Sequence, residues 1–301
     1  MKKLFDLLIL KFIIRSKINL WLGRIIFKNT GGLVSNSIGT YIKRRDPSKA
    51  KKLGFHKKEN PMVNSLKEKG FLMLNDIQNE KTITELAVLW DKYTHQLELP
   101  ESGRLELSSA DKAKDLEEFI PLLEKLITED IQDFLESYFG SYSRIINYHL
   151  YRNRKPPHLS ELDSYGATAN WHTDGSTSES IKLFFMLSDV TENNGPMQAI
   201  SIEDSRNVFI KNSFFFPDSK GETRKFINEE AHIFNFQGKA GSLYYALTND
   251  ALHRATIPKD GEHRDLLVFY ITSSSKKRPV NQQLKEANYR EIYGLQRLFI
   301  N

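Results

Sequence analysis

Two histidines and one aspartate have the residue types and spacing to bind one metal ion. His172 and Asp174 are two residues apart in the segment from Trp171 to Gly175, and alternation along an extended chain points them to the same side. His253 follows a separate β-rich run much later in the chain. A lone His-x-Asp is a common triplet, so the third residue carries the argument. Two histidines and one carboxylate form the facial triad of non-haem Fe(II) oxygenases, which leaves coordination positions open.

Two basic residues are candidates for binding a cofactor beside that metal. Arg264 follows His253 by eleven residues and begins a predicted strand. Its guanidinium fork suits the far carboxylate of an α-keto acid that chelates the metal. Lys182, on the strand after the metal pair, either reaches toward the keto acid or points to solvent. Each of the other four residues also has a structural alternative. His172 and Asp174 could form a strand-end hydrogen bond, and His253 could be an ordinary loop residue. Arg264 could form an ion pair with Glu262 or Asp265.

These residues together resemble a known family. His172-x-Asp174, His253 and Arg264, with Asn194-Gly195-Pro196-Met197 after the second strand, look like the phytanoyl-CoA dioxygenase family of iron(II)/2-oxoglutarate oxygenases. The resemblance covers roughly residues 140–275. It implies Fe(II), 2-oxoglutarate and O2 as cofactors, His172, Asp174 and His253 as catalytic metal ligands, and Arg264 as the 2-oxoglutarate-binding residue. It also implies hydroxylation of a C–H bond. Where many members have Pro-Gly-Ser-His after this segment, the present chain has Ala199-Ile-Ser-Ile-Glu-Asp-Ser-Arg206, so the substrate is not carried over.

The elements that must position these residues predict a mainly β fold with flanking helices. Short β-rich runs at 144–151, 181–190, 242–247 and 265–272 follow two helical stripes, one through Leu86–Leu97 and one through Leu116–Tyr138 that ends at Gly140. The stretch 203–237 interrupts the strands and is a candidate lid, and a last stripe runs from Leu284 to Phe299. Antiparallel strands with helices outside indicate a double-stranded β-helix of the jelly-roll or cupin type. Trp171, Phe184 and Phe185 are expected in its core.

The charge divides the chain into two parts. Residues 1–58 contain fifteen of the 43 Lys and Arg but two of the 38 acids, which leaves 28 basic against 36 acidic residues in 59–301. We therefore predict a basic amphipathic leader and linker over 1–58 and a dioxygenase domain over 59–301, with its β-helix core at about 140–275. The run from Leu4 to Ile14 is too short and too charged for a spanning helix, which needs about 20 apolar residues.

The leader also indicates a partner. Apolar residues between 18 and 25 recur at helical spacing with basic residues opposite, a pattern typical of a helix at a bilayer interface. We expect residues 1–30 to bind a membrane surface rather than nucleic acid, with packing on the body as the alternative. The expected location is cytoplasmic, peripheral on the inner face of the membrane.

The sequence excludes some chemistry and leaves several functions open. The chain has no cysteine, which excludes thiol nucleophiles, Cys-ligated zinc and iron–sulfur clusters. The favoured function is a dioxygenase acting on a small or lipid-linked substrate, with a lipid-linked sugar of the lipopolysaccharide kind ranked above an acyl-CoA. A zinc hydrolase with the same three ligands and a non-catalytic membrane-associated barrel are the alternatives.

Overall fold

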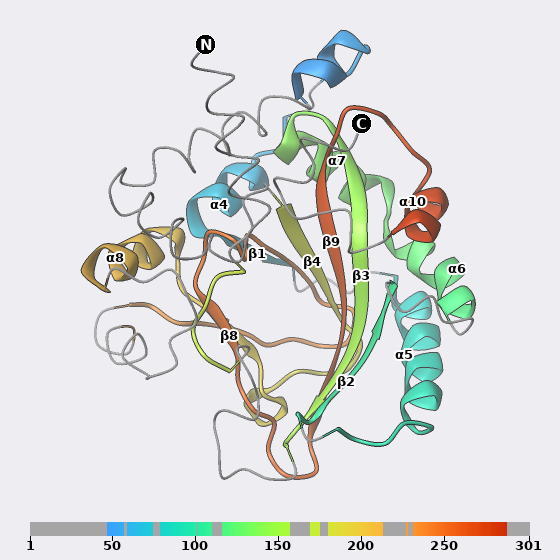
Figure 1. The fold of residues 1–301 in the computed structure, drawn as a ribbon, viewed down its shortest axis with the longest axis vertical. Helices are drawn as coiled ribbons and strands as arrows, with labels where there is room; N and C mark the ends of the chain where they lie inside the picture. The colour runs from blue at the N-terminus through green and yellow to red at the C-terminus, as the bar shows by residue number, and fades with distance from the viewer. Residues whose placement is uncertain are drawn as a thin grey trace, which may run out of the picture.

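The computed structural model describes residues 47–56, 59–74, 79–100, 102–109, 116–156, 169–174, 180–212, 227 and 231–287. Within these residues the strands form two antiparallel sheets (Figure 1). The larger sheet has the order β1 (Phe71–Leu74), β7 (Leu243–Ala246), β4 (Ser180–Met186), β9 (His263–Ser274), β3 (Tyr142–Arg154), β2 (Arg104–Ser108). The smaller sheet has the order β6 (Phe234–Phe236), β5 (Met197–Ala199), β8 (His253–Ala255).

The helices pack mainly on the outer face of the larger sheet. They are α4 (Met62–Lys69), α5 (Glu80–Thr94), α6 (Leu116–Leu126), α7 (Glu129–Phe139), α8 (Ile202–Asn212) and α10 (Val280–Glu286). Figure 1 shows α5, α6 and α10 on the side of β3 and β9 that faces away from β8. The architecture is therefore mainly β with flanking helices, as predicted, and the two sheets give it a jelly-roll core.

Alternation along the strands of the larger sheet separates two apolar layers. On β9, Leu267 and Phe269 belong to the large core beneath the helices, whereas Leu266 and Val268 belong to a second core that includes residues of β5 and β6. The second core therefore fills the space between the two sheets, because successive residues of a strand point to opposite faces. The aromatic residues expected in the core are all buried: Trp171 is 2% exposed, Phe184 7% and Phe185 0%.

The long helical stripe before the sheet is two helices rather than one. Leu116–Tyr138 was predicted as one element, but α6 ends at Leu126 and α7 begins at Glu129. Thr128 is the N-cap of α7, with its side-chain oxygen accepting a hydrogen bond from the Ile131 amide at 3.4 Å. A Thr cap followed by Glu129 and Asp130 favours a new helix start, and this outweighs the continuous apolar spacing.

Three further predicted segments differ from the structure or fall partly outside it. The segment 1–58, predicted as leader and linker, contains a short helix over residues 47–52, and Ala50 is fully buried. The candidate lid 203–237 contains most of α8 and all of β6, while 213–226 and 228–230 lie outside the described residues. The last predicted helix is described only as α10, up to Glu286.

No helix in the described part of the chain combines the length and the apolar character needed to cross a bilayer. The predicted leader, residues 1–30, lies outside the described residues.

Candidate metal centre

The two histidines are held opposite each other by a backbone bridge. His172 lies in the segment 169–174 and pairs with His253, the first residue of β8. The amide of each residue donates to the carbonyl of the other at 3.0 Å, and the two ring centroids are 4.4 Å apart. The Asp174 amide donates to the Thr248 carbonyl at 2.9 Å, which fixes the third residue beside them.

Apolar neighbours anchor this pair from behind. Trp171 and Leu252 each precede one of the histidines, and both are buried in a small core with Ile200 and Val208. The guanidinium of Arg254 lies over the Trp171 ring at 4.9 Å. Because neighbouring residues of an extended chain point in opposite directions, burying Trp171 and Leu252 turns His172 and His253 toward the space between the sheets.

The segment Asn194-Gly195-Pro196-Met197 after β4 supports the end of β8 that lies opposite to His253. Gly195 has a φ of +69°, and a Cβ at this position would lie 2.5 Å from the Thr256 carbonyl oxygen. This close approach allows the Pro196 carbonyl to accept hydrogen bonds from the Thr256 amide at 3.1 Å and from its hydroxyl at 2.7 Å. Gly195 is therefore required by the backbone that holds β8 in place.

The side chains of the triad converge. His172, Asp174 and His253 each offer one ligand atom, and these atoms all lie within 4.8 Å of one another. Nε2 of His253 is 3.9 Å from Oδ1 of Asp174. In each histidine, Nδ1 faces a backbone carbonyl: Asn170 at 2.7 Å for His172, and Ala251 at 3.1 Å for His253. Nδ1–H donates to that oxygen, so Nε2 keeps its lone pair for a metal.

The charges of the site match such a role. Burial lowers the pKa of His172, and it lowers the pKa of His253 to about 3, so both rings are neutral at physiological pH. Burial opposes ionisation of Asp174, but the charge and hydrogen bond of the Lys182 ammonium outweigh it and hold the pKa of this carboxyl well below its usual range. Two neutral imidazoles and one carboxylate fit a divalent transition metal.

Lys182 joins this cluster directly. Its Nζ is 2.8 Å from Oδ2 of Asp174 and 4.7 Å from the centre of the Tyr270 ring. The side chain is 13% exposed and shares the inner face of β4 with Phe184. Lys182 therefore points into the space between the sheets rather than to solvent.

Arg264 lies on the same inner face, at the other end of β9. It is 3% exposed, it is in register with Asn153 of β3, and its charge acts on Tyr244. Tyr270, the β9 residue opposite Lys182, is six residues further along, or roughly 20 Å of strand. The structure therefore brings Lys182 to the triad but places the Arg264 backbone deeper in the barrel, with its side chain facing inward.

A row of polar and aromatic side chains on the inner face was missed from the sequence. The Tyr270 hydroxyl is 3.5 Å from that of Tyr151, whose ring stacks on His149 at 5.2 Å and lies under the Arg104 guanidinium at 3.8 Å. His149 also contacts Glu106. Period-two alternation along β3 and β9 could have placed Tyr151, Tyr270 and His149 on the inner face. Arg104 and Glu106 could not be placed, because their strand, β2, was not predicted. This row extends the inner wall from Lys182 toward β2.

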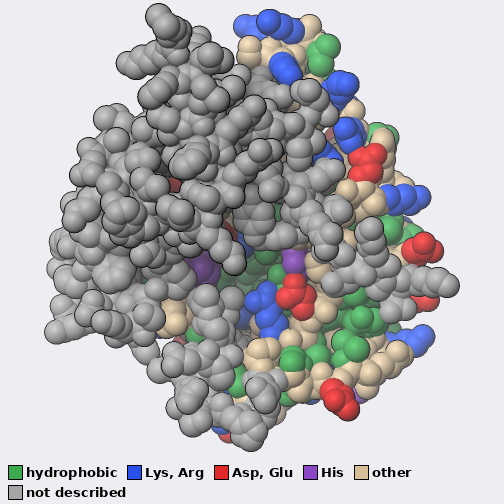
Figure 2. Space-filling view, in the orientation of Figure 1, with side chains coloured by type: hydrophobic (Ala, Val, Ile, Leu, Met, Phe, Trp, Pro, Cys, Tyr) green, Lys and Arg blue, Asp and Glu red, His purple; other side chains and the backbone are tan. Residues whose placement is uncertain are grey.

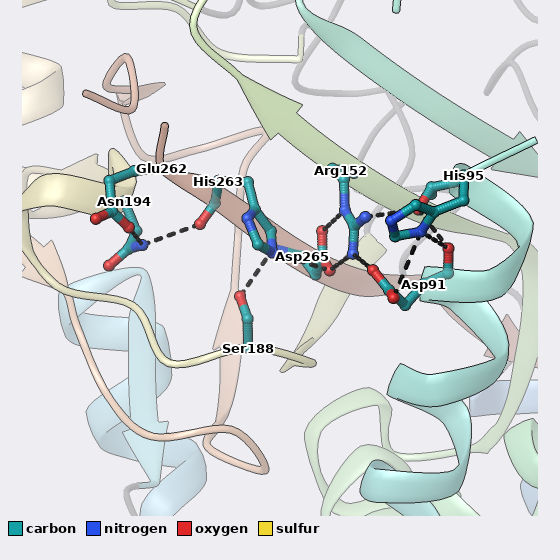
Figure 3. A network of polar contacts seen from close by, with 9 residues as sticks. Asp91, His95, Arg152, Ser188, Asn194, Glu262, His263 and Asp265 are labelled. Carbon is teal, nitrogen blue, oxygen red and sulfur yellow. Dashed lines mark hydrogen bonds and ion pairs between the residues drawn. The ribbon is translucent and has the colours of Figure 1, made fainter. Parts of the chain in front are cut away.

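The network in Figure 3 holds both neighbours of Arg264 on the outer face. Arg152 donates to Asp265 through Nε at 2.8 Å and through Nη2 at 2.6 Å, and its Nη1 donates to the Thr94 hydroxyl at 2.6 Å. Nε2 of His263 lies 3.6 Å from Asp265. The Asp265 amide donates to the Ser188 hydroxyl at 3.1 Å. With His263 and Asp265 fixed outward, Arg264 must point inward.

Comparisons with known proteins place the fold. No protein-family model matches the sequence, and no curated protein matches it. Among solved structures, EctD from S. alaskensis with 2-oxoglutarate and 5-hydroxyectoine aligns with a TM-score of 0.51 at 13% identity, over 75% of this chain and 83% of that one. The non-heme alpha ketoglutarate dependent carbocyclase SnoK from nogalamycin biosynthesis aligns with a TM-score of 0.51 at 12% identity, over 72% and 84% of the two chains. At these identities the likeness shows a shared fold, and it confirms the predicted double-stranded β-helix.

Proposed function

We propose that this chain is a non-haem Fe(II)/2-oxoglutarate-dependent dioxygenase that hydroxylates a C–H bond. The observation that carries the proposal is the convergence of His172, Asp174 and His253 within 4.8 Å between the sheets, with both Nε2 atoms left for a metal. The fold shared with EctD, solved with 2-oxoglutarate, and with the alpha ketoglutarate dependent carbocyclase SnoK supports it.

The residues of the site have distinct roles in this proposal. His172, Asp174 and His253 would hold Fe(II), and Lys182 and Arg264 would bind 2-oxoglutarate. Bound iron and 2-oxoglutarate supply the oxidising power for C–H hydroxylation with O2. Lys182 holds the Asp174 carboxylate in a fixed direction and adds positive charge where a keto acid's near carboxylate would lie. Arg264 provides a buried guanidinium fork for its far carboxylate.

The test is an anaerobic titration of the metal-free protein with Fe(II) and 2-oxoglutarate. Bidentate chelation of iron by the keto acid is expected to give a weak visible charge-transfer band. Replacing Arg264 with methionine is expected to raise the 2-oxoglutarate concentration for half-maximal absorbance at least tenfold, because a charge-assisted bond is worth about 1.5–3 kcal/mol. Arg206→Met, on the exposed side of α8, is the matched control and should leave the titration unchanged.

The other outcomes separate the alternatives. Iron binding without the band would contradict the proposal and favour a zinc hydrolase, which gives Arg264 no cofactor to bind. Absence of any bound metal in protein supplied with iron under reducing conditions would favour a non-catalytic barrel. If Arg264→Met and Arg206→Met needed the same 2-oxoglutarate concentration for half-maximal absorbance, Arg264 would not bind 2-oxoglutarate. Lys182 would then be the remaining basic residue of the site that binds it.

For the substrate, we propose a membrane-associated or lipid-linked molecule, a lipid-linked sugar ahead of an acyl-CoA, reached from the cytoplasmic face. The support is the concentration of basic residues in 1–58, which suits an anionic membrane surface. Deleting residues 1–30 is expected to reduce sedimentation with anionic vesicles strongly, because the segment carries seven Lys and Arg against one acid. Unchanged sedimentation of the truncated protein would refute the role of this leader.

A further inference from the structure

The short helix over residues 47–52 lies at one end of the larger sheet. Phe55, just after this helix, packs its ring edge-on against Tyr142 at 5.1 Å between centroids. Tyr142 begins β3 and is in register with Ser274, the last residue of β9. The loop after β9 therefore lies beside the helix, although more than two hundred residues separate them in sequence. Figure 1 shows both at the top of the molecule.

Lysines gather on these two segments. The residues concerned are all exposed: Lys49, Lys51, Lys52, Lys276 and Lys277. We call these five lysines, together with Leu53, the basic end. Among the described residues none of the five has an ion-pair partner. Figure 2 shows Lys and Arg side chains collected along this end of the molecule.

The metal centre is at the same end of the sheet. Lys182, which contacts Asp174, is in register with Tyr270, and Ser180 with Thr272. Tyr270 is four residues before Ser274, or roughly 13 Å along the strand. A flat surface against the basic end would therefore lie close to the metal centre, whereas the Arg264 end of β9 would point away from it.

We propose that the basic end docks on an anionic bilayer and presents the metal centre to it. The inference rests on the membrane association in the proposed function, but not on its iron chemistry. Five exposed lysines are complementary to an anionic lipid surface, which attracts each lysine that lies within about a Debye length of it. The chain also enters the described body here, because residue 47 follows directly on the basic segment before it.

An exposed apolar side chain distinguishes a bilayer from nucleic acid. Leu53 is 61% exposed and sits among the lysines, where it can enter the interface as their ammonium groups contact the head groups. Single-stranded nucleic acid is bound by a positively charged groove that also carries aromatic side chains on which the bases stack. The exposed apolar side chain of the basic end is aliphatic, and Arg278, which follows Lys277, is paired with Glu286. A bilayer is the better match.

The first experiment measures binding of the full-length protein to vesicles of equal parts phosphatidylcholine and phosphatidylglycerol. Lys276→Gln/Lys277→Gln is expected to weaken partitioning roughly 25-fold, at about fivefold per lysine. Lys81→Gln/Lys92→Gln is the matched control, since it removes the same charge from exposed positions on α5 and should cost much less. Lys276 and Lys277 are far from the leader in sequence, so their loss reports on the folded body.

The second experiment asks which side faces the lipid. The chain has no cysteine, so a single introduced cysteine carries a fluorophore at one known place. A label at Leu53→Cys is expected to shift to the blue on vesicle addition and to be quenched by nitroxide lipids. A label at Val88→Cys, which replaces a residue 66% exposed on α5, should respond to neither.

Both experiments test whether the basic end binds a bilayer, and neither depends on the iron chemistry. Vesicle binding with a silent Leu53 label and equal behaviour of the two double variants would overturn the inference, and would leave attachment to the leader alone. Stronger binding to a single-stranded DNA oligonucleotide than to vesicles, lost in Lys276→Gln/Lys277→Gln, would assign the basic end to nucleic acid and overturn it as well. The charge-transfer band tests the enzyme and is unaffected by either result.

Discussion

Replacing Arg152 with methionine is expected to lower the free energy of unfolding by about 3–5 kcal/mol, the cost of leaving a buried partner charge uncompensated. The side chains of Arg152 and Asp265 are 3% and 5% exposed, and they lie 2.6 Å apart. Methionine would keep the apolar stem of Arg152 and leave the Asp265 carboxylate without its two hydrogen bonds. Urea unfolding followed by circular dichroism measures the loss.

Two further variants identify the cause. Arg152→Met/Asp265→Leu is expected to recover most of the stability, because replacing both members of a buried pair by apolar residues is often nearly neutral. Asp91, the second carboxylate on Arg152, is 53% exposed and can be solvated by water when the arginine is removed. Lys239→Met breaks the exposed pair with Asp189 and should leave the urea midpoint unchanged. A double variant as unstable as Arg152→Met would contradict the ion-pair explanation.

The local patterns of the sequence were sufficient for four strands of the larger sheet and for grouping His172, Asp174 and His253 as candidate ligands. Period-two alternation located β3, β4, β7 and β9, and the two-residue spacing of His172 and Asp174 placed them on one side of an extended segment. His253 could be added because it follows a strand, and in an antiparallel jelly roll such strand ends meet. These features depend on neighbours within a few residues, which is the range over which a single sequence is informative.

What the sequence did not predict depends on contacts between distant segments. Arg152 is in an unremarkable strand, and its burial follows from Asp265 and Thr94, which come from β9 and α5. The partnership of Lys182 with Asp174 likewise requires the register of β4. The helix break at Thr128 is a different case, because its capping signal is local; the apolar stripe through Leu116–Tyr138 was given more weight than the cap.

Replacing Asp174 with alanine is expected to abolish 2-oxoglutarate turnover and to weaken Fe(II) binding by more than the roughly 100-fold that loss of an outer-shell partner costs. Asp174 is the carboxylate of the triad, and its removal leaves two imidazoles and the Lys182 ammonium, whose positive charge would then oppose a cation. Iron binding by the apo-protein, measured by competition with a chelator, and succinate release are the two readouts.

Asp174→Asn separates the chemistry from the fold. It keeps the shape of the side chain and a hydrogen-bonding oxygen near Lys182 at 2.8 Å, but removes the charge that a divalent ion requires. We expect it to lose iron and to unfold at a urea concentration between those of the parent and Asp174→Ala, because the amide oxygen can still accept a hydrogen bond from the 13% exposed Lys182 but no longer balances its charge. Asp189→Asn, at an exposed carboxylate on the surface, should retain both activity and iron. If Asp174→Asn bound iron as tightly as Asp189→Asn, the Asp174 carboxylate would not be a ligand. The proximity of His172 and His253 would then be a consequence only of the backbone bridge that joins them.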